Sequence, residues 1–167
     1  MIQYIKPIKT WQYFVWITVI IILSGLAFKT LGFISDFMMH IFNWIPSKLL
    51  LNMGLDGAYS ISKLIITYTF FLFFMVLILP IIEEFYFRGY LLPRMPVKLK
   101  GWTEIIHSGL FALYHTWTPW LFITRTIAVL PLVFIVKRKQ NVYIGIIAHC
   151  MVNVVDFISG LVFILHM

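Results

Sequence analysis

A long uncharged stretch that ends in three closely spaced charges constrains this chain more than any other feature. The stretch from Leu64 to Leu79 has no charged residue, glycine or proline, which predicts a helix in lipid. It leads directly into Pro80-Ile-Ile-Glu-Glu-Phe-Tyr-Phe-Arg-Gly89. A charged side chain deep in a membrane helix costs about 2.5–3.5 kcal/mol on insertion scales, so such residues usually face a protein interior and mark a functional site. Glu83 and Glu84 are therefore the first candidates for an active site.

The composition is that of an integral membrane protein. Of the 167 residues, 62% are hydrophobic and 11% are charged, and the mean hydropathy is +0.96, whereas soluble domains carry about 25% charged residues. We expect a single domain over residues 1–167, folded as an all-α polytopic helical bundle in the lipid bilayer. The net charge of +7 lies in short basic clusters beside apolar stretches, as in the cytosolic loops of membrane proteins, and we reject nucleic acid as a partner.

The apolar segments predict about five transmembrane helices. They cover residues 11–33, 60–92, 102–115, 120–136 and 142–165. Residues 35–59 mix polar residues, Gly and Pro with apolar ones, which suits an interfacial or re-entrant segment.

The distribution of basic residues predicts the orientation of these helices. Nine of the basic residues fall on one side of this arrangement, namely Lys6, Lys9, Arg88, Arg94, Lys98, Lys100, Lys137, Arg138 and Lys139. The positive-inside rule places that side in the cytosol. We therefore expect a cytosolic N-terminus and an external C-terminus.

The spacing of the three charges predicts different roles for the two carboxylates. Adjacent helical residues point about 100° apart, so Glu83 and Glu84 cannot share one partner in the same geometry. Glu84 and Arg88 are four apart, in the favourable order of acid then base. Glu83 is left without a partner on its own helix and is suited to act as a general base. Alternatively, the three charges form a structural network or lie at the level of the lipid headgroups.

Two further polar pairs occur within apolar helices. They are Phe111-Ala-Leu-Tyr-His115 and His149-Cys-Met-Val-Asn153, and the second pair shares one helix face. A single histidine in a membrane helix can serve as an interhelical hydrogen bond. Together with Glu83, however, they supply a carboxylate, two imidazoles and an amide from three helices, which is typical of water activation. The motifs of zinc, serine and aspartyl hydrolases are absent from the sequence.

In order and separation, these three motifs resemble those of the CPBP family, the type II CAAX prenyl endopeptidases and bacteriocin-processing (Abi) proteins. The resemblance covers residues 77–156 and implies an intramembrane endopeptidase with a helical-bundle fold. It also implies that Glu83 activates water and that Glu84 and Arg88 support it. His115 would assist Glu83 or bind metal, while His149 and Asn153 would stabilise the oxyanion.

The resemblance also implies a class of substrate and a location. The substrate would be a membrane-associated CAAX protein or a peptide precursor, in bacteriocin processing or self-immunity, and the location a bacterial plasma membrane. Because the chain is short, a homo-oligomer could supply further substrate-entry surface. The alternatives are a non-catalytic immunity or scaffold protein and a small proton-coupled carrier that uses Glu83.

The need for a metal ion stays open at the level of sequence. Glu83, His115 and His149 could hold one zinc ion with water as the fourth ligand. The competing mechanism needs no cofactor, because Glu83 can polarise water while His149 and Asn153 bind the oxyanion. We favour the mechanism without metal.

Overall fold

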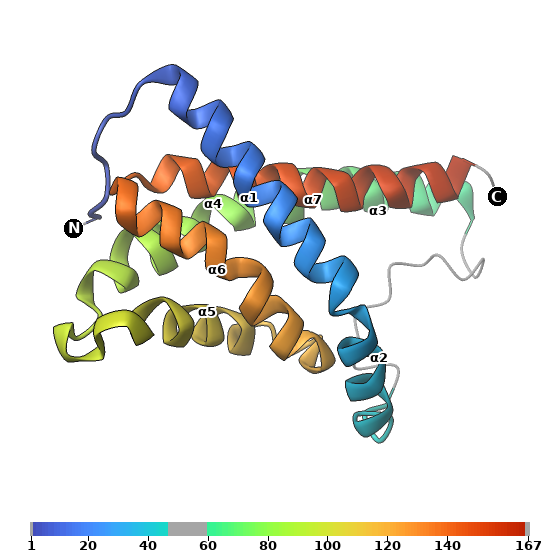
Figure 1. The fold of residues 1–167 in the computed structure, drawn as a ribbon. Helices are drawn as coiled ribbons and strands as arrows, with labels where there is room; N and C mark the ends of the chain where they lie inside the picture. Colours follow the sequence, from blue (N-terminus) through green and yellow to red (C-terminus); the bar gives the residue numbers. More distant parts are fainter. Residues whose placement is uncertain (1, 47–59, 166–167) are drawn as a thin grey trace.

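The computed structural model describes residues 2–46 and 60–165 and confirms an all-α bundle in these ranges (Figure 1). Apart from a single bridge between Ile5 and Asn141, all regular structure there is helical. In chain order the elements are α1 (Thr10–Thr30), α2 (Gly32–Ile41), α3 (Ile61–Phe71), the π-helix η2 (Leu72–Ile78), α4 (Leu79–Glu84), the π-helix η3 (Phe85–Leu91), the 3₁₀ turns η4 (Leu92–Arg94) and η5 (Val97–Trp102), α5 (Thr103–Tyr114), η6 (Pro119–Leu121), α6 (Phe122–Lys139) and α7 (Val142–Leu165).

Four helices of the described ranges, rather than five, are long and apolar enough to cross a membrane. They are Thr10–Thr30, Ile61–Arg94, Pro119–Lys139 and Val142–Val162. The predicted third span is α5, which has 12 residues and therefore extends about 18 Å, against about 30 Å of hydrocarbon. The sequence analysis placed this helix at residues 102–115, close to its observed bounds, but counted it as a span on its apolar pattern although it is too short to cross the hydrocarbon.

Hydrogen bonds and an ion pair show which helix ends lie together. At one end, Lys137 of α6 pairs with Glu104 of α5 at 2.8 Å. At the other end, the hydroxyls of Ser35 and Thr124 are 2.6 Å apart, which joins α2 to the start of α6. Residues 103–124 therefore run the length of α6 and take the chain along the bundle once more, in addition to the four long helices. As a result, the N- and C-termini lie at opposite ends of the bundle (Figure 1).

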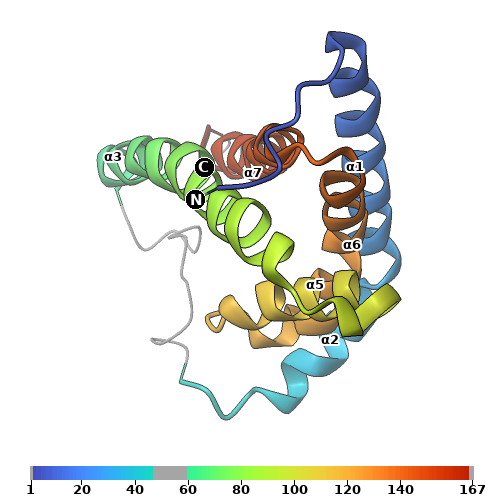
Figure 2. The ribbon, with the colours of Figure 1, turned by 90° about the vertical axis from the view of Figure 1, so that its left-hand side faces the viewer.

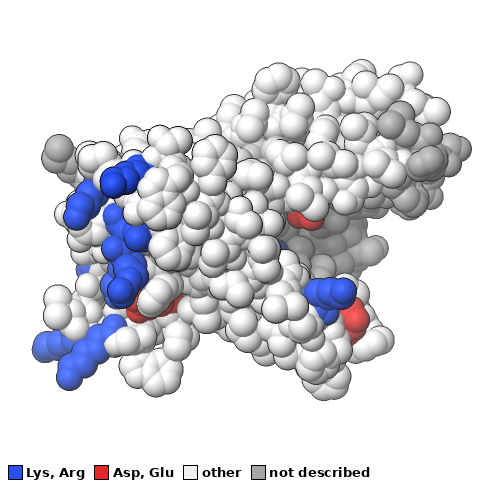
Figure 3. Space-filling view, turned by 45° about the horizontal axis from the view of Figure 1, so that its top comes forward, with Lys and Arg blue, Asp and Glu red and all other residues white. Residues whose placement is uncertain are grey.

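The basic side chains gather at the end that holds the N-terminus (Figure 3). A smaller group of charged side chains is visible at the opposite end. Arg88, which the sequence analysis counted among the nine basic residues of this side, is fully buried. It forms the predicted pair with Glu84 inside the protein, so it does not contribute to the exposed basic charge at this end.

The predicted interfacial segment lies partly in α2 and partly outside the described residues. Residues 35–41 belong to α2, and residues 47–59 are among those not described.

The N-terminal segment connects three helices. The amide of Gln3 donates to the carbonyl oxygen of Gly89 at 2.7 Å, and that of Lys6 donates to Gln140 at 2.8 Å. The side chain of Asn141 accepts from the amide of Ile144, which caps α7, and its Nδ2 donates to the Lys6 carbonyl. These contacts fix the ends of η3, α6 and α7 relative to one another.

The helices bury small and branched side chains against one another and expose large apolar ones. Ile20, Val136 and Ile144 belong to one core cluster between α1, α6 and α7. Phe14 and Phe70 are 72% and 61% exposed, as expected of side chains that face lipid. Figure 2 shows α7 between the α3–α4 helix on one side and α1 and α6 on the other, with α5 below them.

Candidate active site

The helix that carries the carboxylates is interrupted by two π-helical segments, a feature often found at functional sites. In η2 the amide of Leu79 donates to Phe74, five residues back. The next such bond would run from residue 80 to the carbonyl of Met75, but Pro80 has no N–H. Nδ2 of Asn153 on α7 donates to this Met75 oxygen instead, at 2.9 Å. The backbone chemistry of one helix thus positions a predicted site residue of another.

Glu84 is the centre of a buried polar cluster. Its Oε1 lies 2.9 Å from Nη1 of Arg88, and both side chains are completely buried. The same oxygen is 3.0 Å from Nδ1 of His149 on α7. The pair of Glu84 and Arg88, predicted from their spacing, is therefore present. Because an ionised carboxylate can only accept, Nδ1 of His149 carries the proton in this contact.

Arg88 is held by aromatic rings as well as by its carboxylate. Its guanidinium carbon lies 4.1 Å from the centroid of Phe111, a favourable cation–π contact. Buried His107 has its Nε2 2.8 Å from the carbonyl oxygen of Phe87, in the second π-helix. The sequence analysis did not assign His107 to this cluster. Its position in α5, eight residues before His115 and on an apolar helix, was the available signal.

Gly145 of α7 leaves the space that Glu84 occupies. A Cβ atom at position 145 would lie 2.6 Å from Oε2 of Glu84 and 3.2 Å from Cγ2 of Val136. Any side chain larger than hydrogen would therefore push the carboxylate from its place. This close approach explains why a glycine occupies the interior of α7, although glycine destabilises a helix relative to alanine.

Glu83 differs from Glu84 in its surroundings, although the two are adjacent. Its side chain is 11% exposed, and its Oε2 lies 3.9 Å from Nε2 of His149. His149 thus lies between the two carboxylates, with one ring nitrogen directed to each. Glu83 forms no ion pair with Arg88 and faces an open cavity, so it keeps the freedom to bind a water molecule and a proton.

His115 follows the last residue of α5 and is not part of the four spanning helices. Its Nδ1 is 2.9 Å from the Phe111 carbonyl, so Nδ1 is the donor and Nε2 keeps a lone pair. Burial, and next the guanidinium of Arg125, lower the pKa of His115 to about 4. The imidazole is therefore neutral near pH 7 and can accept a hydrogen bond from water.

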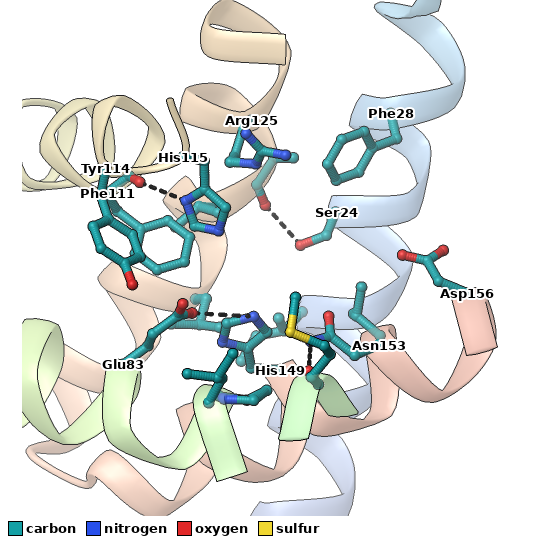
Figure 4. Close-up of a pocket in the computed structure, with 18 of the residues that line it drawn as sticks. Ser24, Phe28, Glu83, Phe111, Tyr114, His115, Arg125, His149, Asn153 and Asp156 are labelled. Carbon is teal, nitrogen blue, oxygen red and sulfur yellow. Dashed lines mark hydrogen bonds and ion pairs between the residues drawn. The ribbon is translucent and has the colours of Figure 1, made fainter. Parts of the chain in front are cut away.

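These side chains surround one cavity of about 270 Å³ (Figure 4). Its polar lining includes the predicted residues Glu83, Arg88, His115, His149 and Asn153. Its other walls are mainly apolar, with Phe28, Phe71, Phe111, Trp117 and Leu132 among them. Glu84 lies behind this surface and contacts two of its lining residues, Arg88 and His149. The structure therefore brings together predicted residues from α4, η3 and α7 and the residue that follows α5.

Arg125 and Asp156 also line the cavity, and the sequence analysis gave neither a role. Arg125 lies on α6, above His115 in Figure 4, and its Nη1 donates to Oγ1 of Thr118 at 2.9 Å. A single arginine in an apolar span was visible in the sequence. The sequence did not show that Arg125 lines the same cavity as the other motifs, because its orientation depends on how α6 packs.

The proposed zinc ligands do not form a metal site in this arrangement. Within the described ranges, no three His, Cys, Asp or Glu side chains are placed to hold a metal ion. In addition, Nδ1 of each histidine is engaged, by Phe111 in one case and by Glu84 in the other. We therefore derive no chemical step through zinc.

The helical membrane bundle thus brings a carboxylate, two imidazoles and an amide to one cavity, a set of groups that is able to activate water. A family model described as type II CAAX prenyl endopeptidase, Rce1-like, matches residues 65–155, more than half of the 167 residues. The chain belongs to this family of membrane endopeptidases, which confirms the resemblance read from the motifs. No curated protein and no solved structure gives a significant match to the chain.

Proposed function

We propose that the chain hydrolyses a peptide bond of a membrane-associated protein or peptide precursor by means of water activated by Glu83. The observation that carries this proposal is the unequal placement of the two carboxylates. Glu84 is fully buried and engaged by Arg88 and His149, whereas Glu83 lies 3.9 Å from His149 and faces the cavity that His115 also lines. Only Glu83 is free to exchange a proton with a bound water.

The first step is the attack of water on the scissile carbonyl carbon. A water in the cavity gives one proton to the Glu83 carboxylate as its oxygen bonds to the carbonyl carbon. Neutral His115 accepts a hydrogen bond from the same water through Nε2 and so orients it. The carbonyl π bond opens and its electron pair moves to oxygen, which gives a tetrahedral oxyanion. Glu83 then gives its proton to the leaving amine as the C–N bond breaks.

The oxyanion needs hydrogen-bond donors that are in place before the reaction. His149 can donate from Nε2 only as an imidazolium, since Nδ1–H is directed to Glu84. Asn153 can donate the second hydrogen of its amide, because the first is bonded to Met75. The two residues lie one helical turn apart on α7.

The surroundings of the site favour an apolar segment as substrate. Phe28, Phe71, Phe111 and Trp117 line the cavity, and apolar pockets with few polar groups bind apolar ligands. We propose a prenylated CAAX-type protein or a bacterial peptide precursor, including one used in bacteriocin processing or self-immunity. We also propose that the reaction needs no metal, because the ligand set for zinc is not assembled.

The test uses the full chain purified into lipid nanodiscs, with a farnesylated C-terminal peptide, the same peptide without the lipid, and peptide precursors encoded beside its gene. Mass spectrometry should find new termini for at least one of these, at rates unchanged by a strong chelator. No cleavage of any of them would contradict the proposed function. One zinc per chain that is lost together with activity on chelation would overturn the metal-free mechanism.

A further inference from the structure

Arg125 presents a cation to the cavity that the proposed mechanism does not use. Its Nη1 donates to Thr118, but a guanidinium carries five N–H donors. The ion pairs of the described residues involve Arg88, Lys137 and His149, and none of them involves Arg125. Asp156 lines the same cavity and likewise forms no ion pair in the described part of the chain.

A cation in an apolar cavity of a membrane protein is costly without a counter-ion. Glu83 attracts Arg125 across the cavity, yet its carboxylate lies beside His149. Phe111, His115 and Ala128 are among the other residues that line this cavity. The site therefore holds a guanidinium with unused donors, aimed at the place where a substrate must lie.

We propose that Arg125 binds a carboxylate of the substrate and thereby selects peptides by the position of that group. This inference rests on the proposed peptidase function and names a determinant of its specificity. The carboxylate is either the free C-terminus of the peptide or an acidic side chain. Arg is suited to this task because its planar fork of donors matches a carboxylate.

The geometry limits how far the carboxylate lies from the cleaved bond. His149 and Asn153 would hold the scissile carbonyl at one side of the cavity, next to the water on Glu83, while Arg125 on α6 would hold the carboxylate at another (Figure 4). The cavity of about 270 Å³ is slightly smaller than most ligand pockets, which measure about 300–1,000 Å³. Only a short segment fits between the two groups, with its side chains against Phe28 and Trp117.

The test measures binding, which does not require cleavage. Three fluorescent peptides of Leu and Ala are compared by anisotropy with the full chain in nanodiscs at pH 7: one with a free C-terminal carboxylate, one with a C-terminal carboxamide, and one carboxamide peptide with a single Glu. The variants are Arg125→Gln and, as a matched control, Thr118→Val, which removes the hydrogen bond between Arg125 and the Thr118 hydroxyl but keeps the guanidinium.

Wild type and Thr118→Val should bind at least one carboxylate peptide roughly 10- to 100-fold more tightly than the neutral peptide, as hydrogen bonds to a charged group imply. Arg125→Gln should lose this difference and bind the neutral peptide as wild type does. The peptide that gains affinity identifies the source of the carboxylate. Equal affinity for all three, no measurable binding of any, or a preference that survives in Arg125→Gln would overturn the inference.

The binding test separates the two proposals. Discrimination by Arg125 without cleavage of any substrate would contradict the peptidase function but keep the carboxylate site. Cleavage that is equally efficient on carboxylate and carboxamide peptides, with equal binding, would keep the function and contradict the role of Arg125.

Discussion

Nδ1 of His149 lies 3.0 Å from Oε1 of Glu84, and the same oxygen forms an ion pair with Nη1 of Arg88. This contact fixes the orientation of the imidazole and directs its other nitrogen to Glu83, 3.9 Å away. A buried ion pair on one helix thus orients a catalytic candidate on another. Glu84 acts in this arrangement as a positioning residue for His149.

Glu84→Gln should destabilise the folded protein strongly. The amide cannot neutralise Arg88, and leaving one partner of a buried ion pair without the other typically costs about 3–5 kcal/mol. Thermal unfolding in detergent measures the loss. Glu104→Gln is the control, because its ion pair with Lys137 is partly exposed and worth at most about 1 kcal/mol. Similar stability of the two variants would refute the structural role of Glu84.

Gly145→Ala should reduce activity by displacing the carboxylate of Glu84. The added Cβ would lie 2.6 Å from Oε2, so the contacts of Glu84 with Arg88 and His149 must change. Gly109→Ala on α5 is the matched control, since its Cβ would meet no atom within 4 Å and alanine favours the helix by about 1 kcal/mol. Turnover and melting temperature are measured for both. A fully active Gly145→Ala protein would show that the close approach is not required.

Asn153→Ala should lower both stability and turnover, for different reasons. It leaves the Met75 carbonyl oxygen without the Nδ2 donor, and a buried acceptor without a partner lowers the free energy of unfolding by about 1–3 kcal/mol. It also removes an oxyanion donor, which typically lowers kcat by about 10²–10³-fold with little change in KM.

Pro80→Ala separates these two effects. An alanine at position 80 has the N–H that the π-helix lacks, so Met75 gains a backbone donor. Asn153→Ala should therefore cost less stability in the Pro80→Ala background than in wild type, while the loss of kcat remains. Recovery of turnover together with stability would mean that Asn153 serves only the backbone.

The sequence predicted the helical bundle and the three motifs because both depend on local patterns. Uncharged segments and i, i+4 spacing identify the spans and the Glu84–Arg88 pair without knowledge of packing. The place of Arg125, the space at Gly145 and the burial of His107 depend on contacts between distant helices. The π-helices have no clear local signal, and they account for the bond from Asn153 to Met75. The bounds of α5 were predicted closely, but its apolar pattern led the sequence analysis to count it as a membrane span, for which it is too short.

The distribution of basic residues predicts the orientation of the bundle in the membrane. A tag at the N-terminus and one within residues 94–100 should be protected from an impermeant reagent in intact cells, and a tag after the last residue should be accessible. This follows from the basic end near the N-terminus (Figure 3), from the opposite position of the C-terminal helix end (Figure 1) and from the positive-inside rule. Protection of all three tags would contradict the orientation.

Comparison of wild type with Glu83→Gln in water enriched in ¹⁸O tests the proposed mechanism most directly. The amide has the shape of the carboxylate but cannot take a proton, so cleavage should fall by about 10²–10⁴-fold at an unchanged melting temperature. Wild type should place one ¹⁸O atom in the new carboxyl group. Near-normal cleavage by Glu83→Gln, or loss of its fold together with its activity, would contradict Glu83 as the base that activates water.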